Sequence, residues 1–229
     1  MRGSPSRILL KLSGEAFQGP EGPISITAIE RIVGEIQTVQ ETEIALVVGG
    51  GNILRGGRAS FDRIEGDTLG MLATVLNALA LRSRLEAAGR HALVQSAVHT
   101  ELADPISIQK ARKALDEGVV VIFAGGTGSP LVTTDTAAAL RAVSIGADLL
   151  AKSSNVPGVY DRDPAKDEDA KLLSEVSFDE FLANRYGVMD QVAVEICREH
   201  KVPIEIFDFD RPGALKAVAA GEQVGTRIG

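Results

Sequence analysis

Hydrophobic and polar positions along the chain alternate between two patterns. Short runs of β-branched and aliphatic residues predict buried strands at residues 8–12, 44–48, 119–124 and 204–207, with weaker candidates at 93–94 and 148–151. Longer stretches with helical periodicity lie between them, at residues 26–41, 67–88, 106–117, 133–145 and 190–200. Because strands that alternate with helices are typical of parallel sheets covered on both faces, the pattern predicts an α/β fold with a mostly parallel sheet.

The predicted helix at residues 67–88 is apolar around most of its circumference. One row of leucines recurs at three- and four-residue spacing, and further apolar residues fill the other faces: Leu69, Leu72, Leu76 and Leu79 in the row, with Met71, Val75, Ala78 and Leu81 beside it. Such a helix is expected to be buried on more than one side. Two interpretations stay open, a central core helix and a helix at a subunit interface.

Composition narrows the function classes. The 229 residues are 45% apolar and 24% charged, as in ordinary globular proteins, and no linker divides them, so we expect a single domain over residues 1–229. The formal net charge of -7 disfavours nucleic acid as a partner, because phosphate backbones require a basic face. No signal-like start or membrane-length apolar run is visible, and Cys197 is the only cysteine, so we expect a cytoplasmic protein without membrane contact.

Three predicted strands end in glycine-rich junctions. These are residues 11–15 (KLSGE), 49–52 (GGGN) and 125–130 (GGTGSP). Glycine allows backbone N–H groups to approach an anion closely, and the helix that follows adds the positive end of its dipole. In open α/β sheets ligands lie beyond the carboxyl ends of the strands. Three such junctions in one chain favour a phosphate-handling site.

Other motifs for familiar chemistries are missing from the sequence. No Walker-type, dinucleotide-binding, nucleophile-elbow or zinc-protease spacing occurs, and the three histidines are scattered. Cys197 lies within a helical pattern and is interpreted as a small buried hydrophobic residue. Lys11 is either an edge-strand lysine with its ammonium group in water or a cation directed at phosphates, and Arg55 suits a second phosphate clamp.

The sequence resembles the bacterial-type UMP kinases of the amino acid kinase superfamily over nearly its whole length. The resemblance rests on KLSGEAF from Lys11, GGGNILRG from Gly49, GDTLGMLATVLNALALR from Gly66, GTGSPLVTTDTAAALRA from Gly126 and GVYDRDPAKD from Gly158. It implies a three-layer α/β/α sandwich around a mainly parallel sheet. It also implies transfer of a phosphoryl group from ATP to UMP, giving ADP and UDP, with Mg²⁺.

The resemblance also implies roles for individual residues. Catalytic roles fall on Lys11, Arg55, Asp135 and Asp190, while Asp148 matches a further acidic position of the family. ATP would be bound by Lys11, Leu12, Ser13, Gly14, Gly51, Arg55, Ser154, Tyr160 and Asp163. UMP would be bound by Gly50, Asp67, Thr127, Gly128, Ser129, Pro130, Leu131, Val132, Thr133 and Thr134. The Mg²⁺ ligands are not assigned.

The chemistry needs no general base. A phosphate monoester is mostly dianionic at neutral pH, so the obstacle is repulsion between two anions, which cations and N–H donors can offset. The family also implies a homo-oligomer, commonly a hexamer, and the effectors GTP and UTP, although Leu93 stands where those members carry a regulatory arginine. Two alternatives are a kinase from another branch of the superfamily and a nucleotide-binding sensor without turnover. The sensor alternative is supported only by Asn155 and Pro157, which replace a lysine and an aspartate of the family.

Overall fold

The computed structural model describes residues 4–54, 61–162, 164 and 166–229. Within them a single sheet contains β1 (Arg7–Leu12), β2 (Glu43–Val48), β3 (Ala92–Ser96), β4 (Asp104–Pro105), β5 (Val120–Ala124), β6 (Leu149–Ser154), β7 (Glu175–Val176), β8 (Ile204–Asp208) and β9 (Thr226–Ile228). The helices are η1 (Gly14–Phe17, 3-10), α1 (Ile26–Gln37), α2 (Arg63–Ala87), α3 (Ile108–Asp116), α4 (Thr134–Ile145), α5 (Phe178–Asn184), α6 (Gln191–Glu199) and α7 (Ala214–Ala219).

The strands lie in the order β4-β3-β5-β2-β1-β6-β8-β9-β7. In this order, each strand from β4 to β8 is parallel to the next one. The pairing of β9 with β8 is antiparallel. The central strand β1 pairs with β2 on one side and with β6 on the other. All carboxyl ends of β1, β2, β3, β5 and β6 therefore meet at one edge of the sheet.

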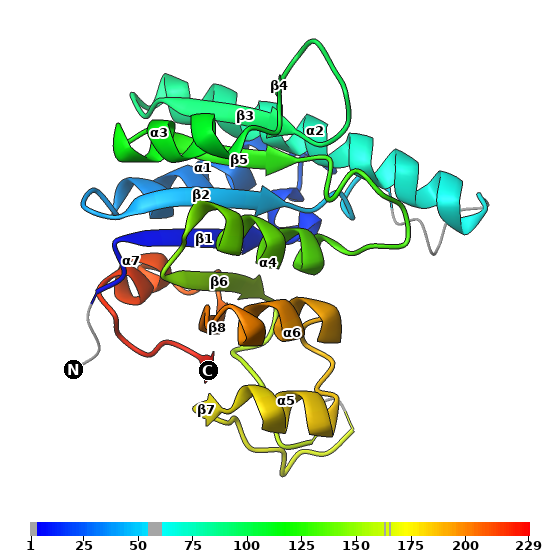
Figure 1. The fold of residues 1–229 in the computed structure, drawn as a ribbon, viewed down its shortest axis with the longest axis vertical. Coiled ribbons are helices and arrows are strands. Elements are labelled where there is room, and N and C mark those ends of the chain that lie inside the picture. The colour runs from blue at the N-terminus through cyan, green and yellow to red at the C-terminus, as the bar shows by residue number, and fades with distance from the viewer. Residues whose placement is uncertain (1–3, 55–60, 163, 165) are drawn as a thin grey trace.

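Helices cover both faces of the sheet, which gives the three layers (Figure 1). Successive side chains along β1 point to opposite faces of the sheet, so they belong in turn to two hydrophobic cores, one on each face. Ile8, Leu10 and Leu12 pack with α1, α2 and α7, whereas Leu9 packs with α3, α4 and α6. The expectation of an α/β sandwich with a mainly parallel sheet is confirmed.

The periodicity located the main elements to within a few residues. All predicted strands are present, and the five predicted helices correspond to α1, α2, α3, α4 and α6. The prediction omitted η1, α5, α7 and the short strands β4, β7 and β9. The omitted elements are two to seven residues long, too short to show a periodicity of their own.

Helix α2 divides into a buried and an exposed side. The apolar residues of the buried side are Ala73, Val75, Ala78, Leu81 and Leu85. Leu69, Leu72 and Leu76 of the leucine row are 37–50% exposed, so the core interpretation is wrong for these three side chains. By length and composition alone α2 could cross a membrane, but in this fold it packs against α1, β3 and β5.

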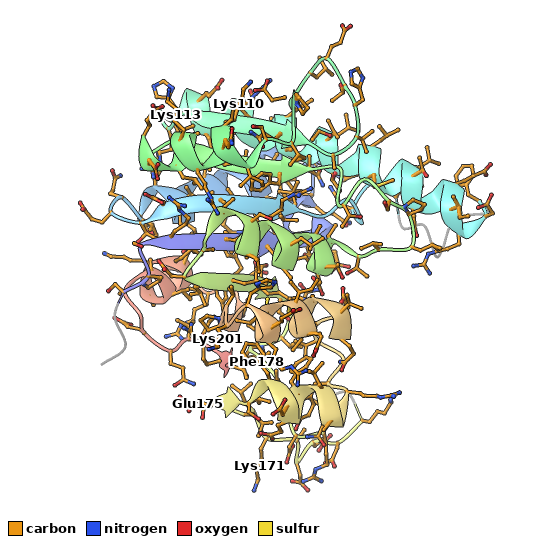
Figure 2. All side chains as sticks on the ribbon, in the orientation of Figure 1. Lys110, Lys113, Lys171, Glu175, Phe178 and Lys201 are labelled. Atoms are coloured by element: carbon orange, nitrogen blue, oxygen red, sulfur yellow. The ribbon has the colours of Figure 1, made fainter. Side chains whose placement is uncertain are left out.

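Most lysines follow the usual rule that ammonium groups stay in water. Lys110, Lys113, Lys171 and Lys201 project from the surface (Figure 2). Lys11 and Lys152 differ, since each is only 8% exposed. Lys11 also belongs to the central strand, so the edge-strand interpretation is wrong.

Cys197 is fully buried in the core beneath α6, and burial raises the pKa of its thiol to about 12. A thiol with such a pKa is almost entirely protonated near neutrality, and only the thiolate is a good nucleophile. We therefore expect the native protein to react slowly with a disulfide reagent at mildly alkaline pH. The guanidinium-unfolded protein should react at once. Rapid labelling of the folded chain, followed by absorbance, would contradict this burial.

Candidate active site

The three glycine-rich junctions lie side by side at the carboxyl edge of the sheet, because they follow the neighbouring strands β5, β2 and β1. A Cβ atom built on Gly14 would lie 2.4 Å from the backbone nitrogen of Gly51. A Cβ atom on Gly49 would lie 2.7 Å from the backbone nitrogen of Gly14. No other residue type fits at this approach, so the first two junctions form one continuous backbone surface.

Helix α2 holds two of the junctions in place through buried polar side chains. The amide nitrogen of Asn77 donates to the Gly49 carbonyl at 2.7 Å and to Asn52 Oδ1 at 2.8 Å. One turn earlier, Thr74 Oγ1 accepts a hydrogen bond from the Gly125 N–H at 2.7 Å. Sequence reasoning gave neither residue a role. The sequence did contain a signal for them, because Thr74 and Asn77 are polar residues on the buried side of an otherwise apolar helix.

A cleft of about 470 Å³ opens between these junctions and α2. It brings together many residues expected to bind the two nucleotides: Lys11, Ser13, Gly14, Gly50, Gly51, Asp67, Ser129, Val132, Thr133 and Thr134. Residues of all three glycine-rich junctions therefore border one cleft. The lining combines glycine backbone with polar and charged side chains, which suits phosphate and ribose groups.

A buried carboxylate lies between two ammonium groups, and one of the two lysines, Lys11, lines the cleft. Lys11 Nζ lies 2.9 Å from Asp135 Oδ1, and Lys152 Nζ lies 2.5 Å from Asp135 Oδ2. Lys152 also donates to the Val188 carbonyl at 2.5 Å. The two lysines are register partners on β1 and β6. Two positive charges against one negative charge leave this cluster, the Lys11–Asp135–Lys152 cluster, with a net charge of about +1.

Burial and neighbouring charge oppose each other in this cluster. Burial would raise the pKa of Asp135, but the charges of Lys11 and Lys152 outweigh it and hold the pKa below its usual value. Burial lowers the pKa of Lys152, and the charge of Asp135 only partly restores it. Asp135 therefore stays ionised near neutrality and orients both lysines.

Lys152 is the main site residue that sequence reasoning missed. The signal was a lysine inside an apolar strand, as at Lys11, but the pairing of β1 with β6 is a tertiary fact. Asp135, for which the resemblance implies a catalytic role, lies at the centre of this cluster. Its carboxylate contacts the lysines rather than open solvent, since it is 8% exposed.

Asp190 has a positioning role in this geometry. Its side chain caps α6 by accepting from the Ala193 N–H at 2.7 Å, and it also accepts hydrogen bonds from the hydroxyl groups of Thr133 and Thr136 on α4. Thr133 in turn caps α4, accepting from the Asp135 and Thr136 N–H groups. The N-termini of α4 and α6 are thereby joined beside Asp135.

Asp67 closes one side of the cleft. Its Oδ2 accepts hydrogen bonds from Arg63 Nε and from the Leu131 N–H, both at 2.9 Å. Burial would raise the pKa of Asp67, but the Leu131 N–H and Arg63 lower it below its usual value. Leu131 adopts a positive φ of 68° to make this contact. The bond attaches the loop after β5 to the start of α2.

Two further cavities continue beyond the cluster. One of about 500 Å³ is lined by Asp135, Lys152 and residues 185–191, and the other, of about 550 Å³, includes Tyr160. Both share Arg185, Tyr186, Gly187 and Val188, so they adjoin. The Lys11–Asp135–Lys152 cluster therefore lies between the glycine cleft and a second ligand-sized space.

Some expected site residues lie elsewhere. Leu12 is fully buried, and its carbonyl accepts from the Gly49 N–H instead of lining the cleft. The glycine cleft is not lined by Ser154, Thr127, Gly128, Pro130 or Leu131. Thr127 lines a neighbouring cavity. Arg55 and Asp163 lie outside the described residues.

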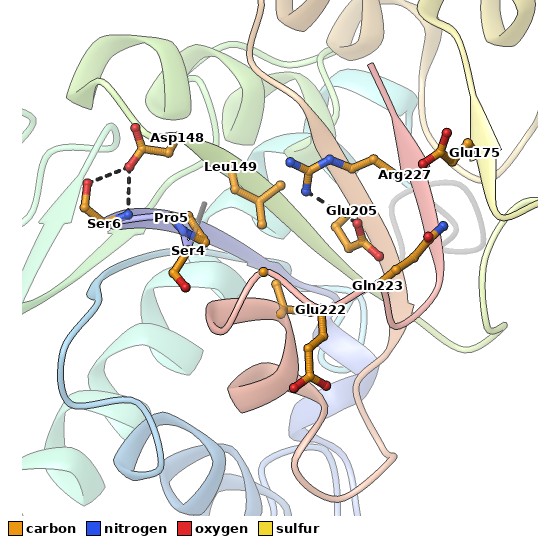
Figure 3. A pocket seen from close by; sticks show the side chains of 12 residues that line it. Ser4, Pro5, Ser6, Asp148, Leu149, Glu175, Glu205, Glu222, Gln223 and Arg227 are labelled. Atoms are coloured by element: carbon orange, nitrogen blue, oxygen red, sulfur yellow. Dashed lines mark hydrogen bonds and ion pairs between the residues drawn. The ribbon is translucent and has the colours of Figure 1, made fainter. Parts of the chain in front are cut away.

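Asp148 is far from the candidate site, so its match to a family acidic position has no catalytic meaning here. It precedes β6 at the amino edge of the sheet, where its Oδ2 accepts from Ser6 and Arg7 backbone N–H groups at 2.9 and 3.0 Å. It borders a cavity of about 470 Å³ that also contains Glu205 and Arg227 (Figure 3). Glu205 accepts hydrogen bonds from the N–H groups of residues 224 and 225 and from Arg227. These charged side chains of the cavity therefore bond to the protein itself.

A glycine-lined cleft at the carboxyl edge of a parallel sheet, with buried ammonium groups beside it, defines a phosphate-transferring class of α/β enzyme. The model for the amino acid kinase family matches residues 6–208. The chain belongs to this family.

Solved structures similar to this chain carry a narrower name. The UMP kinase from Bacillus anthracis superimposes with a TM-score of 0.94 at 34% identity, over 99% of this chain and 96% of that one. The UMP kinase from Ureaplasma parvum gives 0.91 at 32% identity, over 100% and 99%. The uridylate kinase from Archaeoglobus fulgidus gives 0.75 at 27% identity, over 97% and 99%.

The close approach of Gly14 to Gly51 makes a sharp test. Gly14→Ala places a Cβ against backbone that cannot rotate away, so we expect a lower Tm and a widened cleft. Gly34→Ala in α1 is the matched control, because its Cβ meets nothing within 4 Å. Alanine there should stabilise the helix by about 0.5–1 kcal/mol. Equal Tm values for the two variants would contradict the packing described.

The Lys11–Asp135–Lys152 cluster predicts a pH-dependent loss of stability. At neutral pH, Asp135→Asn should cost about 3–5 kcal/mol of unfolding free energy, because it leaves two buried ammonium groups without their counter-ion. The folded pKa of Asp135 is lowered, so its contribution is present above the unfolded pKa of about 3.9 and is lost as pH falls through the folded pKa.

The free-energy gap between wild type and variant should therefore narrow between neutral pH and about pH 3, as measured by denaturant titration. Asp179→Asn is the control, because Asp179 forms an exposed pair with Arg198 and its loss should matter much less. A gap that stays constant over this range would overturn the charge assignment.

Proposed function

We propose that this protein is a UMP kinase, which transfers the γ-phosphoryl group of ATP to UMP and forms ADP and UDP. One observation carries the proposal: the glycine cleft and the second cavity lie on either side of the Lys11–Asp135–Lys152 cluster. The similarity to two UMP kinases above 30% identity over nearly the whole chain supports the choice of substrate.

UMP is assigned to the glycine cleft. Its phosphate would lie against Gly50 and Gly51, where backbone N–H groups and Lys11 are at hand. Asp67 of α2 lines that cleft, and its bonds with Arg63 and the Leu131 N–H hold its carboxylate in place. This carboxylate would accept a hydrogen bond from a ribose hydroxyl group. The loop after β5 supplies Ser129, Val132 and Thr133 around the nucleoside.

ATP is assigned to the other side of the cluster. The cavities lined by Tyr160 and Tyr186 have the aromatic and backbone groups that a nucleoside needs. Its phosphates would extend toward Ser13, Gly14 and Lys11 and meet those of UMP there. Neighbouring strands β1 and β6 thus carry the two halves of the site.

The reaction is a transfer of one phosphoryl group between two phosphate oxygens. An oxygen of the UMP phosphate forms a bond to the γ-phosphorus of ATP while the bond from that phosphorus to the β–γ bridging oxygen breaks, and ADP leaves with the electron pair. No proton has to be removed, because the attacking phosphate is already mostly dianionic. The protein contributes position and positive charge.

Lys11 supplies that charge most directly. Its ammonium group lines the cleft and is held by Asp135, so it is oriented before substrates bind. Lys152 satisfies the other oxygen of Asp135, which keeps Asp135 from neutralising Lys11 completely. Preorganised charge of this kind stabilises the developing charge of the transition state.

Mg²⁺ is proposed to arrive with ATP. The described residues contain no group of three His, Cys, Asp or Glu side chains that could hold a metal ion. The carboxylates of Asp135 and Asp190 are already occupied by lysines, hydroxyls and an N–H group. Mg²⁺ commonly keeps several waters and binds through substrate phosphates, so this site fits an ion held mainly by ATP.

An oligomer, possible control by GTP and UTP, and a cytoplasmic location complete the proposal. The exposed apolar residues of α2 and its approach support assembly: Phe61, Ile64, Leu69, Leu72 and Leu76 are 37–54% exposed. Contiguous exposed apolar side chains on one helix commonly mark a protein interface. The acidic net charge disfavours a nucleic acid partner, whereas a small anionic ligand needs only a local cationic group such as Lys11 in the cleft.

Lysine replacements test the mechanism. Lys11→Ala should lower kcat by about 100-fold or more, because one preorganised charge contact is lost. Lys152→Met should lower kcat at least about tenfold with a smaller effect on the KM values, because it leaves Asp135 to pair with Lys11 alone. Exposed Lys201→Met serves as the control and should leave kcat unchanged.

Formation of ADP that depends on UMP, in a coupled assay, is the measurement. Activity toward glutamate, aspartate or carbamate instead of UMP would refute the assignment. So would nucleotide binding without turnover in the wild-type protein.

The exposed face of α2 predicts the state of the protein in solution. Light scattering should give a mass above that of one chain, and Leu72→Glu with Leu76→Glu should shift the mass toward the monomer. Leu102→Glu, at an exposed leucine outside α2, is the control and should not change it. A stable wild-type monomer at micromolar concentration would contradict assembly through α2.

A further inference from the structure

A separate cavity of about 340 Å³ lies beside the loop that follows β5. Residues of this loop line different spaces, since Gly126 and Ser129 line the glycine cleft and Thr127 lines this cavity. The other walls come from three places in the fold. Ser96 ends β3 and Ala97 and His99 follow it, Pro105 and Ile106 precede α3, and Arg141 belongs to α4. We call this space the Arg141 pocket.

Arg141 has donors that the protein does not use. Its Nε is buried without a hydrogen-bond partner, and no hydrogen bond or ion pair joins Arg141 to another residue in the part of the chain that the structure describes. Arg7 shows the usual contrast, because it contacts Glu43, Asp116 and the Ile145 carbonyl. Partly buried guanidinium groups are normally paired, because unpaired donors carry a desolvation cost.

Stacking on an aromatic ring does not remove this deficit. The guanidinium carbon of Arg141 lies 5.7 Å from the centroid of the Phe123 ring, within range of a cation–π contact. A cation–π contact offers no lone pair to the five N–H donors of the guanidinium, and Nε stays without an acceptor. Burial also lowers the pKa of Arg141, which reflects the poor solvation of its charge. An anion in the plane would satisfy both the donors and the charge.

The remaining lining residues suit an anion. None of the described residues that line the Arg141 pocket is acidic, unlike the cavity at the amino edge of the sheet. His99 adds a ring nitrogen, and Thr127 adds a hydroxyl group whose hydrogen bonds, to the Ser129 carbonyl and from the Ser129 N–H, are long at 3.3 Å. The volume is at the lower end of the range for ligand sites, so a small ligand fits best.

We propose that the Arg141 pocket binds a small oxyanion such as inorganic phosphate, and that the bound anion steadies the loop after β5. A planar guanidinium matches two oxygens of a tetrahedral oxyanion. The anion would join Arg141 on α4 to Thr127 on the loop.

The loop and the floor of the pocket are packed too closely to move independently. A Cβ on Gly128 would lie 3.1 Å from the Ala97 carbonyl oxygen, and a Cβ on Gly125 would lie 2.6 Å from the Val98 nitrogen. An anion that restrains this segment reduces the ordering that a nucleotide in the cleft must impose. Resting on the proposed function, the second part of the inference is that phosphate lowers the KM for UMP.

The binding test uses the full chain saturated with UMP and a non-hydrolysable ATP analogue, so that the cleft cannot accept phosphate. Radiolabelled inorganic phosphate is then titrated by equilibrium dialysis. Wild type should bind about one phosphate per chain, and Arg141→Met should bind at least about tenfold more weakly. Arg112→Met is the control, because Arg112 is exposed on α3 and donates to the Ser144 carbonyl instead.

Arg141→Lys keeps the charge without the planar fork and should bind with intermediate affinity, which covers the case in which the Met variant does not fold. The pocket assignment is overturned if wild type binds no phosphate at tens of millimolar, or if folded Arg141→Met binds as well as wild type. Equal affinity of the Lys variant and wild type would refute recognition by the fork.

The kinetic test measures the KM for UMP with and without phosphate. Phosphate should lower the KM in wild type and in Arg112→Met, and should leave it unchanged or raise it by competition in Arg141→Met. If phosphate binds but changes the KM for UMP equally in wild type and Arg141→Met, the effect on UMP binding is overturned and the assignment of the pocket stands. If the protein does not phosphorylate UMP at all, the proposed function fails, and dialysis of phosphate into the nucleotide-free chain, compared between wild type and Arg141→Met, still decides the pocket.

Discussion

The ion pairs of Asp135 are the interaction on which the rest of the site depends. A carboxylate that is 8% exposed is stable only because two ammonium groups face its two oxygens, and those ammonium groups are tolerated only because of the carboxylate. The arrangement joins α4 to the two central strands β1 and β6. It also leaves an excess of positive charge beside the glycine cleft, in a chain whose overall charge is -7.

Close backbone packing is the second constraint, and it explains why glycine is needed where it occurs. A side chain on Gly14 would clash with the Gly51 backbone, and one on Gly49 would clash with the Gly14 backbone. Helix α2 supports the same surface from the other side through Thr74 and Asn77. A surface made of backbone N–H groups is only as accurate as the contacts that hold the backbone, so these polar side chains help to set the geometry of the cleft.

The loop after β5 connects several parts of the molecule. It is attached to α2 through the bond between Asp67 and the Leu131 N–H, and it packs on the segment after β3 through Gly125 and Gly128. At its end Thr133 caps α4, whose first turn contains Asp135. A change in this loop would therefore reach the substrate cleft and the charged cluster together, which makes it the natural place for a ligand outside the cleft to influence catalysis.

The sequence by itself determined the α/β class, the main strands and helices, and the three glycine junctions, because hydrophobic periodicity and glycine chemistry are local properties. The motifs from Lys11 to Gly158 also sufficed for the family. Tertiary structure alone decided that Lys152 pairs with Asp135, that Asp148 lies at the opposite edge of the sheet, and that Leu72 and Leu76 face outward. Each of these depends on which strands are neighbours and on which side of a helix meets the sheet, and residues far apart in the chain settle both.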